Sequence, residues 1–232
     1  MRIRCFHARL PDAEFKRRNI MKKITSIIAI LVLGTSALFA REITISVGAG
    51  ENWKGRHSPQ FAVWLEDMEG NYIKTLYVTA KASKKSWIFA PKRGRPESLP
   101  VWYHASKQDT RKGKEAQKAN NFLGLDAVTS ATPKGGIIFN QEIEDTDCII
   151  KAEFNVSFDY NNFYTKKNSS DNGQPSLVYQ AEIRKGESEE VKLTFAGSGS
   201  LDGSDGLIHR DTEGITTASS IVKITRVTFP QE

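Results

Sequence analysis

The stretch Asp126-Ala-Val-Thr-Ser-Ala-Thr-Pro133 has the composition best suited to chemistry in this chain. Its side chains are small, so another molecule could approach the backbone closely. Thr132 carries a hydroxyl, and Pro133 favours an extended conformation for the residue before it. Asp126 can brace a turn through its carboxylate. By composition alone, the stretch is typical of an ordinary turn that links two parts of a β domain.

The same residues, Asp126 to Thr132, resemble the acceptor motif of flavin-carrying domains outside the cytoplasm. In those domains a flavin transferase joins FMN to a threonine through a phosphoester bond. Asp126, Thr129, Ala131 and Thr132 match the motif, whereas Ser130 stands where glycine is usual. The resemblance implies covalent FMN on Thr132, with the other four residues around the attachment site.

A basic segment, residues 91–121, leads into this stretch. Its cations are Lys92, Arg93, Arg95, Lys107, Arg111, Lys112, Lys114 and Lys118. In its middle lies an aromatic island that contains Trp102 and His104. Cations with embedded aromatic rings can bind a phosphate or stack on a flat ring. We therefore take Trp102, His104, Arg93 and Arg95 as a candidate ligand or partner surface. The alternative is a long solvated loop whose Trp102 packs into the domain. We expect no helix of useful length in this segment or elsewhere in residues 41–232.

Other chemistry finds little support. His57, His104 and His209 have no partner at metal-ligand spacing, so we expect no metal site. The run 197–200 lacks the spacing of a nucleophile elbow. The run 202–206 suggests a flexible turn rather than a calcium loop. We predict no catalytic residue and, apart from the FMN alternative, no cofactor.

Residues 21–40 have the features of a signal peptide. A basic start at Met21 is followed by an apolar run over residues 24–39, and Ala40 ends it. We expect a periplasmic or exported protein with no transmembrane span after removal of this signal. Residues 1–20 precede the signal awkwardly and read as an over-extended N-terminus. Once the leader is removed, Cys148 is the only cysteine, and a small buried apolar residue is its simplest interpretation.

Removal of the leader also changes the charge balance. Residues 41–232 carry 25 Lys or Arg and 25 Asp or Glu, so the excess of positive charge belongs to the leader. The overall charge therefore gives no case for nucleic-acid binding.

Alternating apolar and polar residues predict an all-β fold for residues 41–232, as one domain. The predicted strands span residues 41–48, 61–67, 72–79, 137–143, 148–160, 176–184, 191–195 and 221–229, with a further short one at 86–89. About eight short strands favour a sandwich or a barrel. In the longest alternation, 148–160, Lys151, Glu153 and Asn155 fall on the polar face. Glu66 and Asp67 read as a solvated rim at a strand end.

A second resemblance covers most of residues 41–232. The runs 60–67, 74–76, 99–102 and 126–134, together with Gly70, Trp87, His104 and the run 173–179, resemble the bacterial family of predicted periplasmic proteins called domain of unknown function 2271. The resemblance implies an immunoglobulin-like β-sandwich and an association with flavin-transfer and redox systems of the cell envelope. A flavin transferase or an envelope redox protein would then be the partner.

Two functions follow from these observations. The first is a non-enzymatic periplasmic β-sandwich that binds a partner and assists an envelope flavin or redox system. The second is an electron carrier with FMN attached through Thr132, in which the protein positions the cofactor and tunes its potential.

Overall fold

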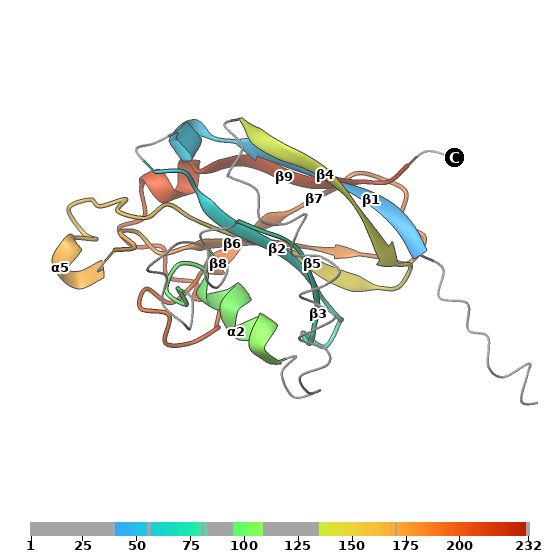
Figure 1. Ribbon diagram of the computed structural model, residues 1–232, viewed down its shortest axis with the longest axis horizontal. Helices are drawn as coiled ribbons and strands as arrows, with labels where there is room; N and C mark the ends of the chain where they lie inside the picture. Colours follow the sequence, from blue (N-terminus) through green and yellow to red (C-terminus); the bar gives the residue numbers. More distant parts are fainter. Residues whose placement is uncertain are drawn as a thin grey trace, which may run out of the picture. The chain divides into compact units, whose positions relative to one another are not determined.

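The alternating pattern of the first strand sets the layout of the domain. In β1 (Ala40–Ala49), Ile43, Ile45 and Val47 are buried on one face, as the alternation predicts. The computed structural model describes residues 40–54, 57–79, 82, 95–108, 135–169 and 171–230. Within them, strands build two antiparallel sheets packed face to face (Figure 1).

We call the four-stranded sheet, of order β4-β1-β9-β7, sheet A. Besides β1 it contains β4 (Gly136–Glu144), β7 (Val191–Lys192) and β9 (Val222–Thr228). We call the five-stranded sheet, of order β3-β2-β5-β6-β8, sheet B. Its strands are β2 (Gln60–Glu66), β3 (Tyr72–Val78), β5 (Cys148–Asn155), β6 (Leu177–Ile183) and β8 (Thr194–Ser198). The predicted β-sandwich is confirmed, and the described residues form nine strands where about eight were expected.

The main core lies between the sheets. It contains Phe61, whose ring stacks on Tyr77 and on Phe154 with centroid distances of 4.9 and 5.4 Å. Cys148 is buried in the same core, as predicted, and burial raises the pKa of its thiol. Such packing of alternating inward residues from two sheets is what holds a β-sandwich together.

The two sides of the sandwich are closed differently. On one side the chain runs directly from β7 in sheet A to β8 in sheet B. Leu193 lies between them, is buried, and donates its backbone N–H to the carbonyl of Thr225 at 2.9 Å. On the other side, β3 and β4 meet through side chains. Lys74 donates to the carbonyl of Glu142, and the rings of Tyr77 and Phe139 lie 5.2 Å apart.

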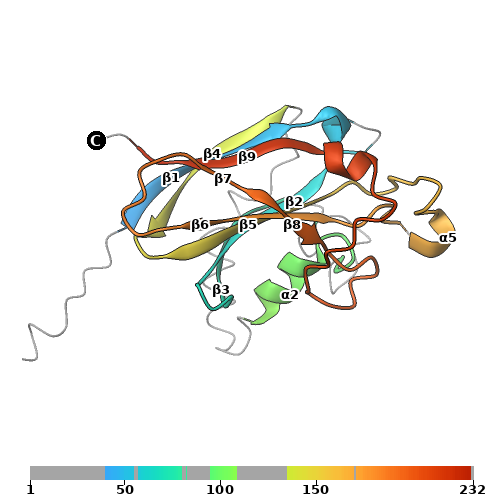
Figure 2. The same ribbon diagram turned by 180° about the vertical axis from the view of Figure 1, so that it is seen from behind.

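A helix covers the outer face of sheet B. Helix α2 (Pro100–Gln108) lies beneath this sheet in Figure 1, and Figure 2 shows the same arrangement from behind. A second apolar cluster fills the space between them. Its buried members are Ala62, Trp64, Val78, Ala82, Leu99, Val101 and Val178. The expectation of no useful helix within residues 91–121 was therefore wrong.

The remaining elements are short. They are the 3-10 helices η1 (Glu51–Lys54) and η3 (Thr217–Ser220) and the helical turn α5 (Lys166–Ser169). Among the described residues, no helix is long and apolar enough to cross a membrane.

One strand is shorter than its alternation predicts. The pattern continues to Tyr160, but β5 ends at Asn155. The chain turns at Phe158, which has a φ of 64° and donates its N–H to the carbonyl of Asp171 at 2.9 Å. Positive φ is unusual for a bulky residue and is incompatible with a continuing strand. The strand predicted at 86–89 lies outside the described residues.

Candidate functional site

A buried carboxylate fastens α2 to sheet B. Glu153 of β5 is fully buried, and its side chain accepts hydrogen bonds from the backbone N–H groups of Val101 and Trp102 at 3.3 and 2.8 Å. Ser176 donates its hydroxyl to the same carboxylate at 2.6 Å. The first N–H groups of a helix lack partners within the helix, and a carboxylate stabilises its positive end. Glu153 thus caps a helix that is far away in sequence.

The protonation of Glu153 is finely balanced. Burial raises its pKa to about 7, against the opposing effect of the three hydrogen bonds it accepts. The charged form is favoured by the helix end and penalised by the loss of water. Glu153 is therefore a titratable group in the physiological pH range at the joint between helix and sheet.

One further hydrogen bond joins α2 to the outer face of sheet B, and a buried ion pair lies within the same face. Trp102 donates its indole N–H to the hydroxyl of Thr75 at 2.8 Å, and that hydroxyl also shares a 2.7 Å hydrogen bond with Tyr72. On the neighbouring strands, the Glu66 carboxylate accepts the indole N–H of Trp64 at 2.7 Å and pairs with Lys151 at 2.6 Å.

The expectation of a solvated rim at Glu66 was wrong, because Glu66 is 4 % exposed and paired. Asp67 accepts the backbone N–H groups of Glu69 and Asn71, so it braces the turn between β2 and β3. The expectation of a wet polar face on the strand of Glu153 was also wrong. Glu153 and Asn155 are buried, because α2 and the loops cover that face.

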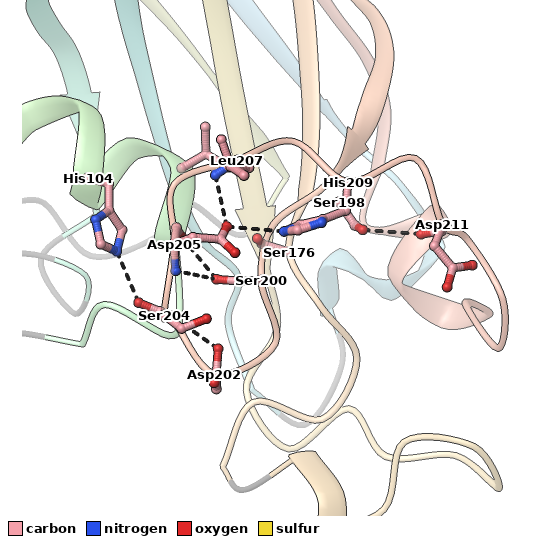
Figure 3. Close-up of polar contacts among 12 residues, drawn as sticks. His104, Ser176, Ser198, Ser200, Asp202, Ser204, Asp205, Leu207, His209 and Asp211 are labelled. Atoms are coloured by element: carbon pink, nitrogen blue, oxygen red, sulfur yellow. Dashed lines mark hydrogen bonds and ion pairs between the residues drawn. The ribbon is translucent and has the colours of Figure 1, made fainter.

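A loop of residues 199–211 leans on α2 (Figure 3). His104 of α2 makes a 3.0 Å hydrogen bond with the carbonyl of Gly203. Within the loop, the Asp205 carboxylate accepts the N–H of Leu207 at 2.9 Å and contacts His209 at 3.1 Å. The bond from Leu207, followed by the contact with His209, holds the pKa of Asp205 below its usual value. The Asp205 carboxylate thus braces the loop, whereas the sequence predicted a flexible turn at 202–206.

This loop contains the residue types of a hydrolase but not its connections. Ser200 donates its hydroxyl to the backbone carbonyl of Asp205 at 3.0 Å, and Ser198 donates to the carbonyl of Asp211 at 3.2 Å. His209 is bonded to Asp205 rather than to either serine (Figure 3). In this arrangement the two hydroxyls and the imidazole hold the loop in shape.

A second polar network joins the loops at one end of the sandwich. The Asp159 carboxylate accepts hydrogen bonds from Asn52, Gln174 and Thr217 at 3.2, 2.9 and 2.7 Å. Burial raises the pKa of Asp159, while the hydrogen bonds from Thr217 and Asn52 lower it. Gly173 has a φ of 76° and lies directly against the backbone of Asp159. These contacts explain why the run 173–179 contains a glycine and a glutamine.

The predicted site residues fall into three groups. Trp102 and His104 lie together on α2 and pack towards sheet B and the 199–211 loop. Arg95 points at other loops: it pairs with Glu97 at 3.1 Å and donates to Ser157 at 3.1 Å and Asn172 at 3.4 Å. Arg93 and the FMN-motif residues Asp126, Thr129, Ser130, Ala131 and Thr132 lie outside the described residues.

One groove opens at the β8 edge of sheet B beside the 199–211 loop. It has a volume of about 420 Å³ and is lined by Gln180, Phe195, Ala196 and Arg210. Sequence reasoning missed these residues, since nothing in their spacing indicates that β6, β8 and the loop meet. It also missed Glu153, for which the only signal was a carboxylate in the middle of a strongly alternating strand. No cluster of metal-ligating side chains occurs in the part of the chain that the structure describes.

The fold and the outer face of sheet B define a class of protein: a β-sandwich in which one sheet carries a helix that is fastened by a buried carboxylate. The family model described as "Predicted periplasmic protein (DUF2271)" matches residues 40–162, more than half of the chain, and the chain belongs to this family. The family gives the chain a periplasmic location and confirms the resemblance found in the sequence. The searches found no matching curated protein and no matching solved structure.

Proposed function

We propose that this protein is a non-enzymatic accessory of an envelope flavin or redox system and that it binds its partner through the helix-covered side of sheet B. The observation that carries the proposal is the use of reactive side chains as structural braces. Glu153 caps α2, His104 holds the 199–211 loop, and His209 is bonded to Asp205. Residues committed in this way support a rigid binding surface better than a reaction.

The helix-covered side also has the features of a docking surface. It presents a helix, a braced loop and an open groove on a sheet whose other face belongs to the core. Loops held by a rigid scaffold are common sites of recognition. The link to a flavin or redox system comes from the resemblance of the motifs and not from the geometry.

A photo-crosslinking experiment tests the proposal in cells. A crosslinking amino acid replaces Ala105 on α2, and in a matched control it replaces the exposed Lys223 on β9 of sheet A. We expect a crosslinked product with flavin fluorescence, or one that contains a redox protein, from position 105 and not from position 223. Equal amounts of crosslinked product from both positions, or no product from position 105, would contradict the proposal.

The second candidate function is an electron carrier with FMN on Thr132. The motif Asp126 to Thr132 favours it, because it offers a threonine hydroxyl in a small-residue setting that resembles known acceptors. Residues 91–121 supply cations that could balance the phosphate of FMN. In this function the protein would need no catalytic residue of its own, since the flavin supplies the redox chemistry.

The intact mass and visible spectrum of protein purified from cells with a flavin transferase separate the two functions. A carrier gains the mass of one FMN and absorbs visible light. Thr132→Ala removes both signals, whereas Ser130→Gly, which introduces the usual glycine, retains them. A colourless protein of unmodified mass would rule the carrier out and leave the accessory function standing.

A further inference from the structure

We propose that the groove at β6 and β8 binds an extended, acidic segment of a partner protein. The segment adds a short strand to the edge of β8 and places a carboxylate on Arg210. This inference rests on the proposed function only in taking a partner protein as the occupant. It specifies where that partner binds and what chemistry the bound segment must have.

The edge of β8 provides the backbone part of the site. β8 is the last strand of sheet B, and the 199–211 loop pairs with its outer edge at a single bridge, Ser198 to His209. The two backbone hydrogen bonds of that bridge are both 2.8 Å long. Before the bridge, Thr194 and Phe195 are exposed, and no other described strand pairs with their outer edge. Unpaired edge strands accept an added strand from a partner.

Arg210 provides the charge. Other arginines of the described chain are paired: Arg41 with Asp145, Arg184 with Asp147 and Arg226 with Glu190. Arg210 is exposed and forms no ion pair or hydrogen bond with a described residue. It directly follows His209, so the bridge to β8 fixes its backbone at the strand edge. An unpaired guanidinium suits the two oxygens of a carboxylate.

Two other residues line the groove, and their side chains lie on opposite faces of sheet B: Phe195 pairs with Tyr179, which faces the core, and Gln180 is the next residue of β6. The side-chain amide of Gln180 has no hydrogen-bond partner among the described residues, so it can donate to a carboxylate or a backbone carbonyl. Phe195 is 46 % exposed, and its ring is held edge-on to Tyr179 at 5.8 Å. An apolar side chain next to the acidic residue would cover this ring. The bound segment therefore alternates apolar and polar residues, with an acidic residue at its centre.

Fluorescence anisotropy with a defined peptide tests the site. The probe is a labelled peptide of sequence Ser-Thr-Val-Glu-Val-Thr-Ser, compared with a peptide that has lysine in place of the glutamate. We expect the mature protein to prefer the glutamate peptide. Arg210→Glu should weaken that peptide about tenfold and reverse the preference, because it replaces attraction by repulsion. N-methylation of the two valines should weaken binding to every variant, since it removes backbone donors.

Lys223→Glu is the matched control, with the same change of charge on sheet A, and should leave the affinity unchanged. Arg210 is exposed and unpaired, so its replacement leaves the fold intact, which circular dichroism checks. A mature protein that binds neither peptide, or one in which Lys223→Glu acts like Arg210→Glu, would overturn the inference. Crosslinking from position 105 reports on the proposed function independently of this result.

Discussion

The carboxylate of Glu153 lies 2.8 Å from the backbone nitrogen of Trp102, although the two residues belong to different elements and are separated by 51 positions in the chain. The contact makes a strand residue the N-terminal cap of a helix. It also places a titratable group with a pKa of about 7 in the buried contact between α2 and sheet B.

Glu153 predicts an unusual dependence of stability on pH. Its folded-state pKa lies above its ordinary value of 4.5, so its contribution is fully present below about pH 4.5 and is lost as pH rises through about 7. The loss attributable to this group is about 3 kcal/mol in the free energy of unfolding. In urea titrations between pH 5 and 8, we expect Glu153→Gln to flatten the profile relative to the unsubstituted protein. Parallel profiles would contradict the assignment.

Truncation at the same position separates the cap from its charge. Glu153→Ala leaves the N–H groups of Val101 and Trp102 and the hydroxyl of Ser176 without their acceptor. Buried groups without partners are costly, so we expect a loss of about 2–4 kcal/mol at pH 6. Glu153→Gln keeps an acceptor oxygen and should lose less. Equal losses for the two variants at pH 6 would mean that the helix does not depend on this cap.

Two glycines with similar backbone angles give a matched pair. Gly173 and Gly186 have φ values of 76° and 71°, but a Cβ on Gly173 would lie 2.5 Å from the backbone of Asp159, whereas one on Gly186 meets nothing within 4 Å. Alanine at position 186 should cost about 1 kcal/mol from the left-handed conformation alone. At position 173 we expect at least about 3 kcal/mol, because the loops must also move. Thermal unfolding followed by circular dichroism measures both, and similar costs would refute the role of the Asp159 contact.

The pair of Lys151 and Glu66 predicts strong coupling. Lys151→Met leaves the buried Glu66 carboxylate with the indole of Trp64 as its remaining hydrogen-bond partner among the described residues. Breaking a buried ion pair costs about 3–5 kcal/mol, whereas removing both charges costs much less. We therefore expect Glu66→Gln to recover most of the stability lost in Lys151→Met. A double-mutant cycle measures this coupling, and additive losses would show that the two charges are independent.

Trp102→Phe tests the indole hydrogen bond. The substitution keeps an aromatic ring in the second apolar cluster but removes the N–H donated to Thr75 at 2.8 Å. Thr75 keeps its bond with Tyr72, so we expect a loss of about 1 kcal/mol in the free energy of unfolding. Trp102→Ala should lose about 3 kcal/mol through lost packing. Thr75→Val in the Trp102→Phe background checks this assignment. It should cause no further loss of unfolding free energy through the bond to position 102, because the indole donor is already absent.

The sheet architecture could be predicted from the sequence because period-two alternation reports directly on burial. Where only one face of a strand is buried, as in β1, the predicted and observed bounds nearly coincide. The prediction failed on β5, where both faces are buried and polar residues such as Glu153 and Asn155 are covered. Alternation alone cannot tell a polar side chain in water from one bonded inside a second layer.

Helix α2 could not be predicted for a related reason. Helices are usually recognised by a local cap, but the cap of α2 is Glu153, far away in the chain. Pro100 at its first position was the one local signal. The groove combines residues from β6, β8 and a loop, so it depends on tertiary structure and has no local pattern. The predicted domain bounds and the Thr132 hypothesis remain predictions, since Thr132 lies outside the described residues.

The chain passes from β7 in sheet A directly to β8 in sheet B at Leu193, so the two margins of the sandwich are held together in different ways. Around Leu193 the layers share a covalent backbone, whereas at the opposite margin the described contacts of β3 with β4 are made by side chains such as Lys74 and Tyr77. Thermal fluctuations should therefore separate the two sheets first at the β3–β4 margin, because the backbone at Leu193 connects the sheets on the other side. Amide hydrogens at the β3–β4 margin should then exchange with solvent sooner than those beside Leu193.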